Sequence, residues 1–170
     1  MPRLLISSLI LLASLMLNAC GFQLKGSRAL PPELAQVHLD YRKGLQVIDA
    51  RVVEEVEAQL IRRGARVSRV PFEGASRLTI QHPDSESRTQ SVGADGDEVE
   101  FEVITSVRFS LEVAGKERIP EQAVVTRRDY SFNSGQALSK QIEDDRLRED
   151  METELAGLVL LQIESRLAPR

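Results

Sequence analysis

The chain has 170 residues, of which 42% are apolar and 28% charged, a composition typical of a globular protein rather than a disordered one. Its formal net charge of −4 and its lack of tryptophan argue against general nucleic-acid binding, which needs a basic footprint. The single cysteine, Cys20, excludes an intramolecular disulfide and a CxxC metal site.

The N-terminal residues have the layout of a secretory signal. Arg3 supplies a positive start, and a short apolar run from Leu4 to Leu17 follows it. A helix of this length spans about 21 Å, less than the ~30 Å hydrocarbon core of a bilayer. We therefore expect residues 1–19 to form a cleaved signal peptide rather than a membrane span.

Cys20 stands where a bacterial lipobox places its cysteine. Leu17 and Ala19 precede it as that motif requires, although the slot of Asn18 more often holds a small residue. The resemblance implies that Cys20 becomes an acylated N-terminus, the alternative being a buried, unmodified thiol. Two or more acyl chains hold a protein stably on a membrane. Where lipoprotein sorting depends on an aspartate after the cysteine, Gly21 resembles an outer-membrane address.

The rest of the chain has the length of one domain with a core. Residues 20–35 mix glycine, proline and charges, which predicts a lipidated tether, and residues 36–168 form the predicted single domain. From Gln36 to Tyr41 apolar and polar residues alternate, which predicts a first short strand.

A helix is predicted from about Gln46 to Arg63. An apolar stripe recurs every four residues, and its members are Ile48, Val52, Val56 and Leu60. Arg62 and Arg63 fall in the last turn, where cations suit the helix dipole, and Gly64 fits the left-handed position that follows.

Strands are predicted next. Leu78 and Ile80 begin one that Pro83 should interrupt, and residues 93–97 read as a turn. The clearest strand runs over 100–113, where apolar and polar residues alternate and one face should be buried. A turn at 114–116 leads to a returning strand over about 121–132.

A long helix follows, with Ser134 a candidate N-cap and an end near Leu167. Its apolar stripe consists of Leu138, Ile142, Leu147, Met151, Leu155, Leu158, Val159 and Ile163. The order of elements predicts an α+β fold: a mostly antiparallel four-stranded sheet with two helices packed on one face.

Catalytic and metal-binding motifs are not evident. His38 and His82 have no metal-ligand partner at helical or hairpin spacing, and the acids around Gly96 lack most ligands of a calcium loop. The sequence therefore predicts no metal, no cofactor and no enzyme, although a lipid-anchored hydrolase stays open as a less favoured alternative.

Basic side chains gather on or beside the predicted sheet. They are Arg77, Arg88, Arg108, Lys116, Arg118, Arg127, Arg128 and Lys140. Cations on one sheet region could bind phosphates despite the negative net charge. The alternative, that each is an ordinary solvated strand residue with a nearby glutamate partner, also stays open.

Several segments together carry a resemblance to a known family. These are residues 20–26 (CGFQLKG), 128–133 (RDYSFN), 136–140 (QALSK) and 149–151 (EDM). Their order and their connection to a lipobox resemble the LPS-assembly lipoprotein family, LptE, from Cys20 to about Leu167. The resemblance implies two helices on a four-stranded sheet and a plug inside the outer-membrane β-barrel LptD. Members assist assembly of that barrel and delivery of lipopolysaccharide to the outer leaflet.

The resemblance also implies where lipopolysaccharide phosphates bind. Members use basic residues near the tip between the central strands and near the start of the last helix. Lys140 matches the second position, whereas the tip at 93–97 carries no base. Arg88, Arg127 or Arg128 could substitute for the missing tip contact. The implied location is the periplasmic side of a Gram-negative outer membrane, and the binding-class rival is a lipid-tethered periplasmic module that recruits another envelope protein.

Overall fold

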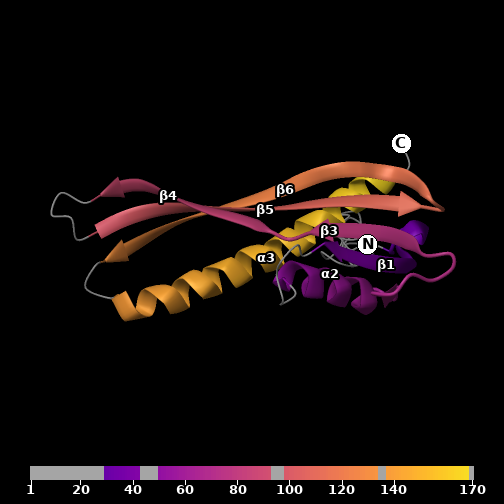
Figure 1. The fold of residues 1–170 in the computed structure, drawn as a ribbon, viewed down its shortest axis with the longest axis horizontal. Helices are drawn as coiled ribbons and strands as arrows, with labels where there is room; N and C mark the ends of the chain where they lie inside the picture. Colours follow the sequence, from indigo (N-terminus) through magenta and orange to yellow (C-terminus); the bar gives the residue numbers. More distant parts are fainter. Residues whose placement is uncertain (1–28, 43–49, 93–97, 134–136, 169–170) are drawn as a thin grey trace, which may run out of the picture.

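The computed structural model describes residues 29–42, 50–92, 98–133 and 137–168, with the backbone alone at 98–99 and 132–142. The elements in order are η1 (Pro32–Leu34), β1 (Gln36–Arg42), α2 (Arg51–Arg62), β2 (Arg66–Ser68), β3 (Ser76–Gln81), β4 (Asp84–Val92), β5 (Glu98–Val113), β6 (Lys116–Asn133) and α3 (Ala137–Leu167). Figure 1 shows an elongated molecule with both helices on the same side of the sheet. β4 and the N-terminal half of α3 lie at one end, and α2 and β1 lie at the other.

The sheet is mixed and has six strands in the described residues, so the prediction of a mostly antiparallel four-stranded sheet is wrong. β1 runs parallel to both β2 and β3. α2 explains the pairing with β2, because a helix between two strands returns the chain to the end of the sheet from which it came. Residues 69–75 then carry the chain to the other side of β1, where β3 starts in the same direction. β2 has three residues, too few to show a period-two pattern. The α+β class and the packing of two helices on one face are confirmed.

Pro83 interrupts the strand that begins at β3, as predicted. Ile80 of β3 pairs with Phe109, and beyond the break Asp84 of β4 pairs with Ser106 on the same edge of β5. β4 is exposed along its whole length. Its sequence has no apolar alternation, so no sequence pattern marks it as a strand.

The predicted helices and the central hairpin agree with the structure. α2 lies within the predicted range, of which residues 46–49 fall outside the described chain. α3 ends at Leu167 as expected, whereas the turn at 93–97 and the cap at Ser134 lie outside the described residues. β5 and β6 are both somewhat longer than predicted.

Three described glycines, Gly64, Gly74 and Gly115, have positive φ. Gly64 follows α2 with φ +89°, as its sequence position predicts. Ala114 and Gly115 connect β5 to β6 with φ values of +50° and +73°, which corresponds to a two-residue hairpin turn with both central residues left-handed. Ala114 is the one non-glycine residue with positive φ among the described residues.

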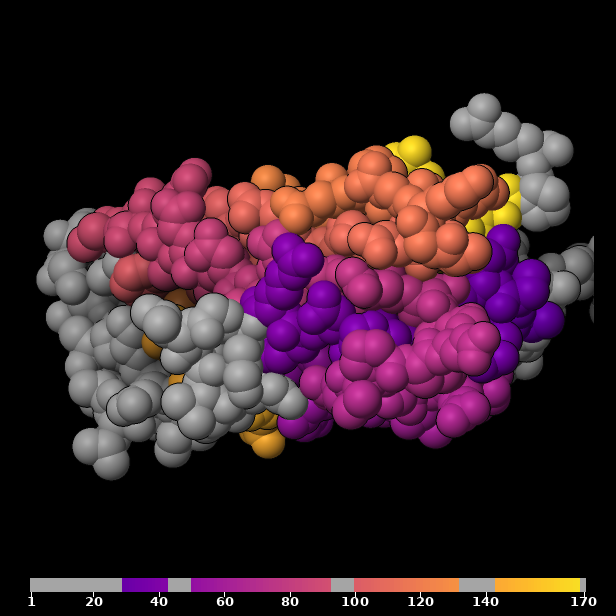
Figure 2. Space-filling model, turned by 45° about the vertical axis from the view of Figure 1, so that its right-hand side comes forward, coloured from indigo at the N-terminus to yellow at the C-terminus, as the bar shows by residue number. Residues whose placement is uncertain are grey.

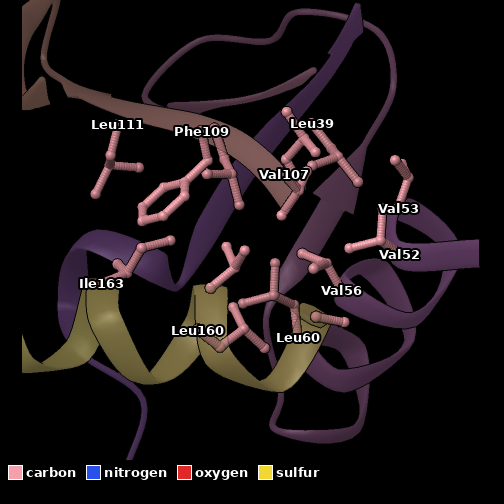
Figure 3. Close-up of a cluster of buried hydrophobic side chains, with 14 of the residues drawn as sticks. Leu39, Val52, Val53, Val56, Leu60, Val107, Phe109, Leu111, Leu160 and Ile163 are labelled. Carbon is pink, nitrogen blue, oxygen red and sulfur yellow. The ribbon is translucent and has the colours of Figure 1, made fainter. Parts of the chain in front are cut away.

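The core lies between the sheet and the two helices at the α2 end. We call the helix-covered side of the sheet its inner face and the opposite side its outer face. On β5 the alternation is as predicted, and its inward side chains Val103, Thr105, Val107, Phe109 and Leu111 are buried. Figure 3 shows the last three of these, Val107, Phe109 and Leu111, facing side chains of α2 and α3. Leu34, in the predicted tether, is also fully buried in this core.

Candidate functional site

Three of the eight basic residues singled out from the sequence, Arg88, Arg127 and Arg128, lie where β4, β5 and β6 run side by side, away from α2. We call this part, residues 84–92, 98–106 and 125–133, the distal sheet. Arg88 pairs with Glu102 across β4 and β5, and Arg127 pairs with Ile104 across β5 and β6. Successive residues of a strand point to opposite faces, so Arg88 and Arg127 lie on the outer face and Arg128 lies on the inner face.

The outer-face arginines form exposed ion pairs. Arg88 donates from Nε and an Nη to both carboxylate oxygens of Glu86, each at 3.0 Å. This contact raises the pKa of Arg88 above its usual value and lowers that of Glu86. Arg127 Nε lies 4.0 Å from Oε1 of Glu102, which is thus flanked by arginines from both neighbouring strands. Exposed pairs of this kind are worth at most about 1 kcal/mol each.

Arg128 has a different environment because it faces α3. Its guanidinium donates to Oε2 of Glu154, and Thr126 donates to the same oxygen at 3.0 Å. Thr126 is buried. The three side chains therefore join β6 to the middle of α3, which makes Arg128 a structural contact between sheet and helix.

A polar layer crosses the inner face beside this contact. Ser85 of β4 and Thr105 of β5 share a hydrogen bond of 2.7 Å between their hydroxyl oxygens. Thr105 also lies 3.8 Å from the sulfur of Met151, as donor to that weak acceptor. Both Thr105 and Met151 are fully buried, but neither belongs to the main core cluster. The distal sheet and the N-terminal half of α3 thus pack separately from the main core.

Beyond the polar layer an aromatic pair covers a small cavity. Phe101 and Tyr130 stack with ring centroids 5.5 Å apart and an angle of 23° between the ring planes. The cavity has a volume of about 60 Å³ and is lined by Ser87, Phe101, Val103, Tyr130, Asp144, Leu147 and Arg148. Partial burial and a hydrogen bond to Asp144 raise the pKa of Tyr130 to about 12. This space suits a water or a methyl group rather than a whole ligand.

The other predicted binding residues are distributed as follows. Lys140 lies in the first turns of α3, but its side chain is outside the described part of the structure, as is the whole of Cys20. Arg77 pairs with Glu112 at 3.6 Å. Within the described residues Arg108 and Arg118 make no ion pair and stay open to solvent.

The histidines do not form a site. Nδ1 of His82 shares a 2.6 Å hydrogen bond with the hydroxyl of Tyr41, next to the break between β3 and β4. No cluster of His, Cys, Asp or Glu in the described chain is arranged to hold a metal ion. Likewise, no helix of the described residues is long and apolar enough to cross a membrane.

Tyr130 and Arg148 were not singled out from the sequence as functional residues. The alternation of β6 could have placed Tyr130 on the inner face, but not beside Phe101, because two register shifts lie between that pair and the hairpin turn. The position of Arg148 depends on how α3 crosses the sheet, which no local pattern determines.

On the outer face of the distal sheet two arginines stand among the carboxylates of Glu86, Glu102 and Asp129. Arginine binds phosphate through two parallel hydrogen bonds, which an anion would gain here in exchange for the existing ion pairs. Arg88 and Arg127 approach this surface from the two strands that flank β5, and no helix covers them. In Figure 2 the surface of β5 and β6 lies open along one side of the molecule.

Comparison with known proteins identifies a family that this sequence matches. The family described as LptE, lipopolysaccharide-assembly, matches residues 34–163. The LPS-assembly lipoprotein LptE of Pectobacterium atrosepticum is 25% identical over 156 residues, which cover 85% of this chain and 77% of that protein.

Two solved structures have the same fold. Rare lipoprotein B of Shewanella oneidensis aligns with a TM-score of 0.63 and 23% identity over 76% of this chain and 94% of its own. Lipoprotein B of Nitrosomonas europaea aligns with a TM-score of 0.65 and 24% identity over 85% and 91%. Because the family match spans most of the described chain, this protein belongs to the LptE family of lipopolysaccharide-assembly proteins.

Proposed function

We propose that this protein is a lipoprotein, acylated at Cys20 and held on the periplasmic side of a Gram-negative outer membrane. From there it occupies the interior of an LptD-type β-barrel, assists assembly of that barrel and binds lipopolysaccharide for delivery to the outer leaflet. The role is non-catalytic. Residues 20–35 connect the acylated cysteine to the domain, although Leu34 already packs in the core.

The observation that carries this proposal, besides the family match, is the uncovered outer face of the sheet. Its side chains on the distal strands are mostly charged or hydroxylated, as in Asp84, Glu86, Arg88, Glu102, Ser106 and Arg127. The interior of an outer-membrane barrel is itself polar. A domain with an open polar face therefore suits such a surrounding better than it suits a lipid bilayer.

We further propose that Arg88, Arg127 and Lys140 contact lipopolysaccharide phosphates. Arg88 and Arg127 are solvent-exposed and make weak ion pairs, so a phosphate group can replace Glu86 or Glu102 at small cost. Arg128 contributes less, because Glu154, which also accepts from Thr126, already holds it against α3.

Purification of the tagged full-length chain from detergent-solubilised membranes tests the central claim. A large β-barrel protein should be recovered with it in near-equal amount. Recovery of the chain without any barrel would contradict the proposal and favour the rival role, a tethered module that recruits a different envelope protein.

Two variants test the anchor and the ligand separately. Cys20→Ala should abolish incorporation of labelled fatty acid and release the domain from the membrane. Lys140→Asp should weaken lipopolysaccharide binding while barrel recovery stays unchanged. Continued fatty-acid labelling of the first variant, or undiminished binding by the second, would remove the assigned role of that residue.

A further inference from the structure

A groove runs between the free edge of β6 and the C-terminal half of α3. Its volume is about 520 Å³, and it is lined by Ala123, Val124, Val125, Leu158, Leu161, Gln162, Ser165 and Arg166. β6 pairs with β5 alone among the described strands, so its other edge carries backbone donors and acceptors without a strand partner. An open edge of this kind is a template for pairing with an added strand.

An exposed leucine beside the open strand edge makes this groove unusual for the surface. Leu161 is 58% exposed on the α3 side, whereas the side chain of Val125, which is 42% exposed, points to the outer face as its pairing partner Ser106 does. They are two of only five large hydrophobic side chains that stand exposed in the described residues. The position of Leu161 next to an unpaired strand edge indicates a contact site.

Polar groups in and beside the groove determine which kind of ligand can bind there. Nε2 of Gln162 donates to Oε1 of Gln122 at 3.3 Å, and Nε2 of Gln122 is buried without a hydrogen-bond partner in the described structure. Arg166 stands at one end of the lining and forms no ion pair with any described residue. The groove therefore combines an apolar helix wall, amide groups and an uncompensated cation.

From this combination we infer that the groove binds an extended segment of a protein partner, which pairs with the edge of β6 and places a carboxylate against Arg166. A peptide backbone satisfies the open strand edge, whereas an acyl chain would leave its donors and acceptors without partners. Side chains that alternate along the added strand would reach Leu158 and Leu161 from one face. The inference deepens the proposed function, since both require a protein partner.

Site-specific photocrosslinking in the full-length chain, expressed in its host, tests the inference. A photoreactive phenylalanine analogue replaces Leu161, and in a control it replaces Ile61, which is 53% exposed on α2 and does not line the groove. The Leu161 probe should give one adduct that maps to a single stretch of one protein containing Asp or Glu. In the purified complex, amides of residues 123–125 should exchange at least about tenfold more slowly than in the free chain.

Charge reversal at Arg166 is the second part of the photocrosslinking experiment. Arg166→Glu should lower the adduct yield by about tenfold, whereas Arg146→Glu, an exposed site elsewhere on α3, should leave it unchanged. Adducts to lipid, to a second copy of the chain, to scattered surfaces or no adduct above the Ile61 background would overturn the inference. Recovery of the barrel with no Leu161 adduct would reject the groove alone, and a mapped adduct on another protein without barrel recovery would reject the proposed function alone.

Discussion

Glu152 of α3 caps the N-terminus of α2: its Oε2 accepts a hydrogen bond of 3.1 Å from the backbone N–H of Val52. The residue at the N-cap position of α2 is Ala50, whose side chain cannot accept a hydrogen bond. The first N–H groups of a helix lack partners within it and attract negative charge. One helix thus supplies the cap that the other lacks, and the contact fixes how the two helices sit against each other.

Removal of this cap should destabilise the fold. Glu152→Ala should lower the free energy of unfolding by about 1 kcal/mol, the usual loss for an N-cap. Urea unfolding followed by circular dichroism measures the change. Glu149→Ala is the matched control, because Glu149 is exposed on the same helix. Equal losses in the two variants would show that the contact with Val52 contributes nothing.

A second contact joins the other ends of the helices. Arg63, which ends α2, pairs with Glu164 of α3, and the two side chains are only 17% and 14% exposed. Loss of one partner leaves a largely buried charge, so Arg63→Met and Glu164→Gln should each cost about 3 kcal/mol. The double variant should cost less than the sum, because neither charge is then left alone.

A neighbouring, more exposed ion pair is the control for Arg63 and Glu164. Arg62 pairs with Glu55 at 2.7 Å, but Arg62 is exposed. Arg62→Ala should therefore cost less than about 1 kcal/mol. Additive losses for Arg63 and Glu164 would show that the two side chains are not coupled.

The hairpin turn offers a stabilising substitution. Ala114 has φ +50°, which costs an ordinary L-residue about 1 kcal/mol or more, and asparagine before glycine is the favoured pair for this turn. Ala114→Asn should raise the free energy of unfolding by about 0.5–1 kcal/mol. Gly115→Ala should lower it by a similar amount, although no atom lies within 4 Å of the added Cβ. Unchanged stability of both variants would mean that the turn is not left-handed in solution.

The sequence predicts the elements that carry a long periodic signal. β5 alternates cleanly because one face is buried and the other is solvated, and α2 shows its apolar stripe and its terminal Gly64. β2 and β4 escape prediction because one is too short and the other has no apolar face. The parallel pairing of β1 with β3 is a property of the connections through α2, β2 and residues 69–75, which a strand-by-strand interpretation omits.

In the candidate site, too, local patterns predict some positions, whereas others depend on long-range packing. The alternation of β6 is enough to place Arg127 and Arg128 on opposite faces of the sheet, although the sequence interpretation grouped them as one basic set. The partner of Arg128 is Glu154, a residue of the following helix. Which turn of α3 faces which strand depends on packing across the whole domain, so that pairing could not be predicted from local patterns.

Ionisation of Tyr130 should make the free energy of unfolding depend on pH. Its pKa in the folded protein is about 12, above the ordinary value of 10.0, so the folded form holds this proton more tightly than the unfolded chain. Its contribution to stability is complete below pH 10 and is lost as the pH rises through about 12. Tyr130→Phe should show a shallower fall in unfolding free energy above pH 10 than the parent protein.

A direct titration checks the same contact. The chain has two tyrosines, so in a Tyr41→Phe variant the absorbance change at high pH reports Tyr130 alone. A midpoint near 12 is expected, and adding Asp144→Asn should move it towards 10, because the hydrogen bond and the charge of Asp144 both raise this pKa. A midpoint at 10 in the first variant would show that Tyr130 is not held against Asp144.

Substitution of Arg127 and Arg128 should separate ligand binding from folding. Arg127 lies on the outer face with a weak, 4.0 Å ion pair, so Arg127→Ala should leave stability within about 0.5 kcal/mol and weaken lipopolysaccharide binding. Arg128→Ala should instead lower stability by about 1 kcal/mol, because Glu154 loses its guanidinium partner and keeps only the hydrogen bond from Thr126, with a smaller effect on binding. Arg88→Ala should follow Arg127→Ala, since both arginines flank Glu102 on the same face. If Arg127→Ala and Arg128→Ala weakened lipopolysaccharide binding equally, although the two residues lie on opposite faces, the ligand would not bind at the outer face.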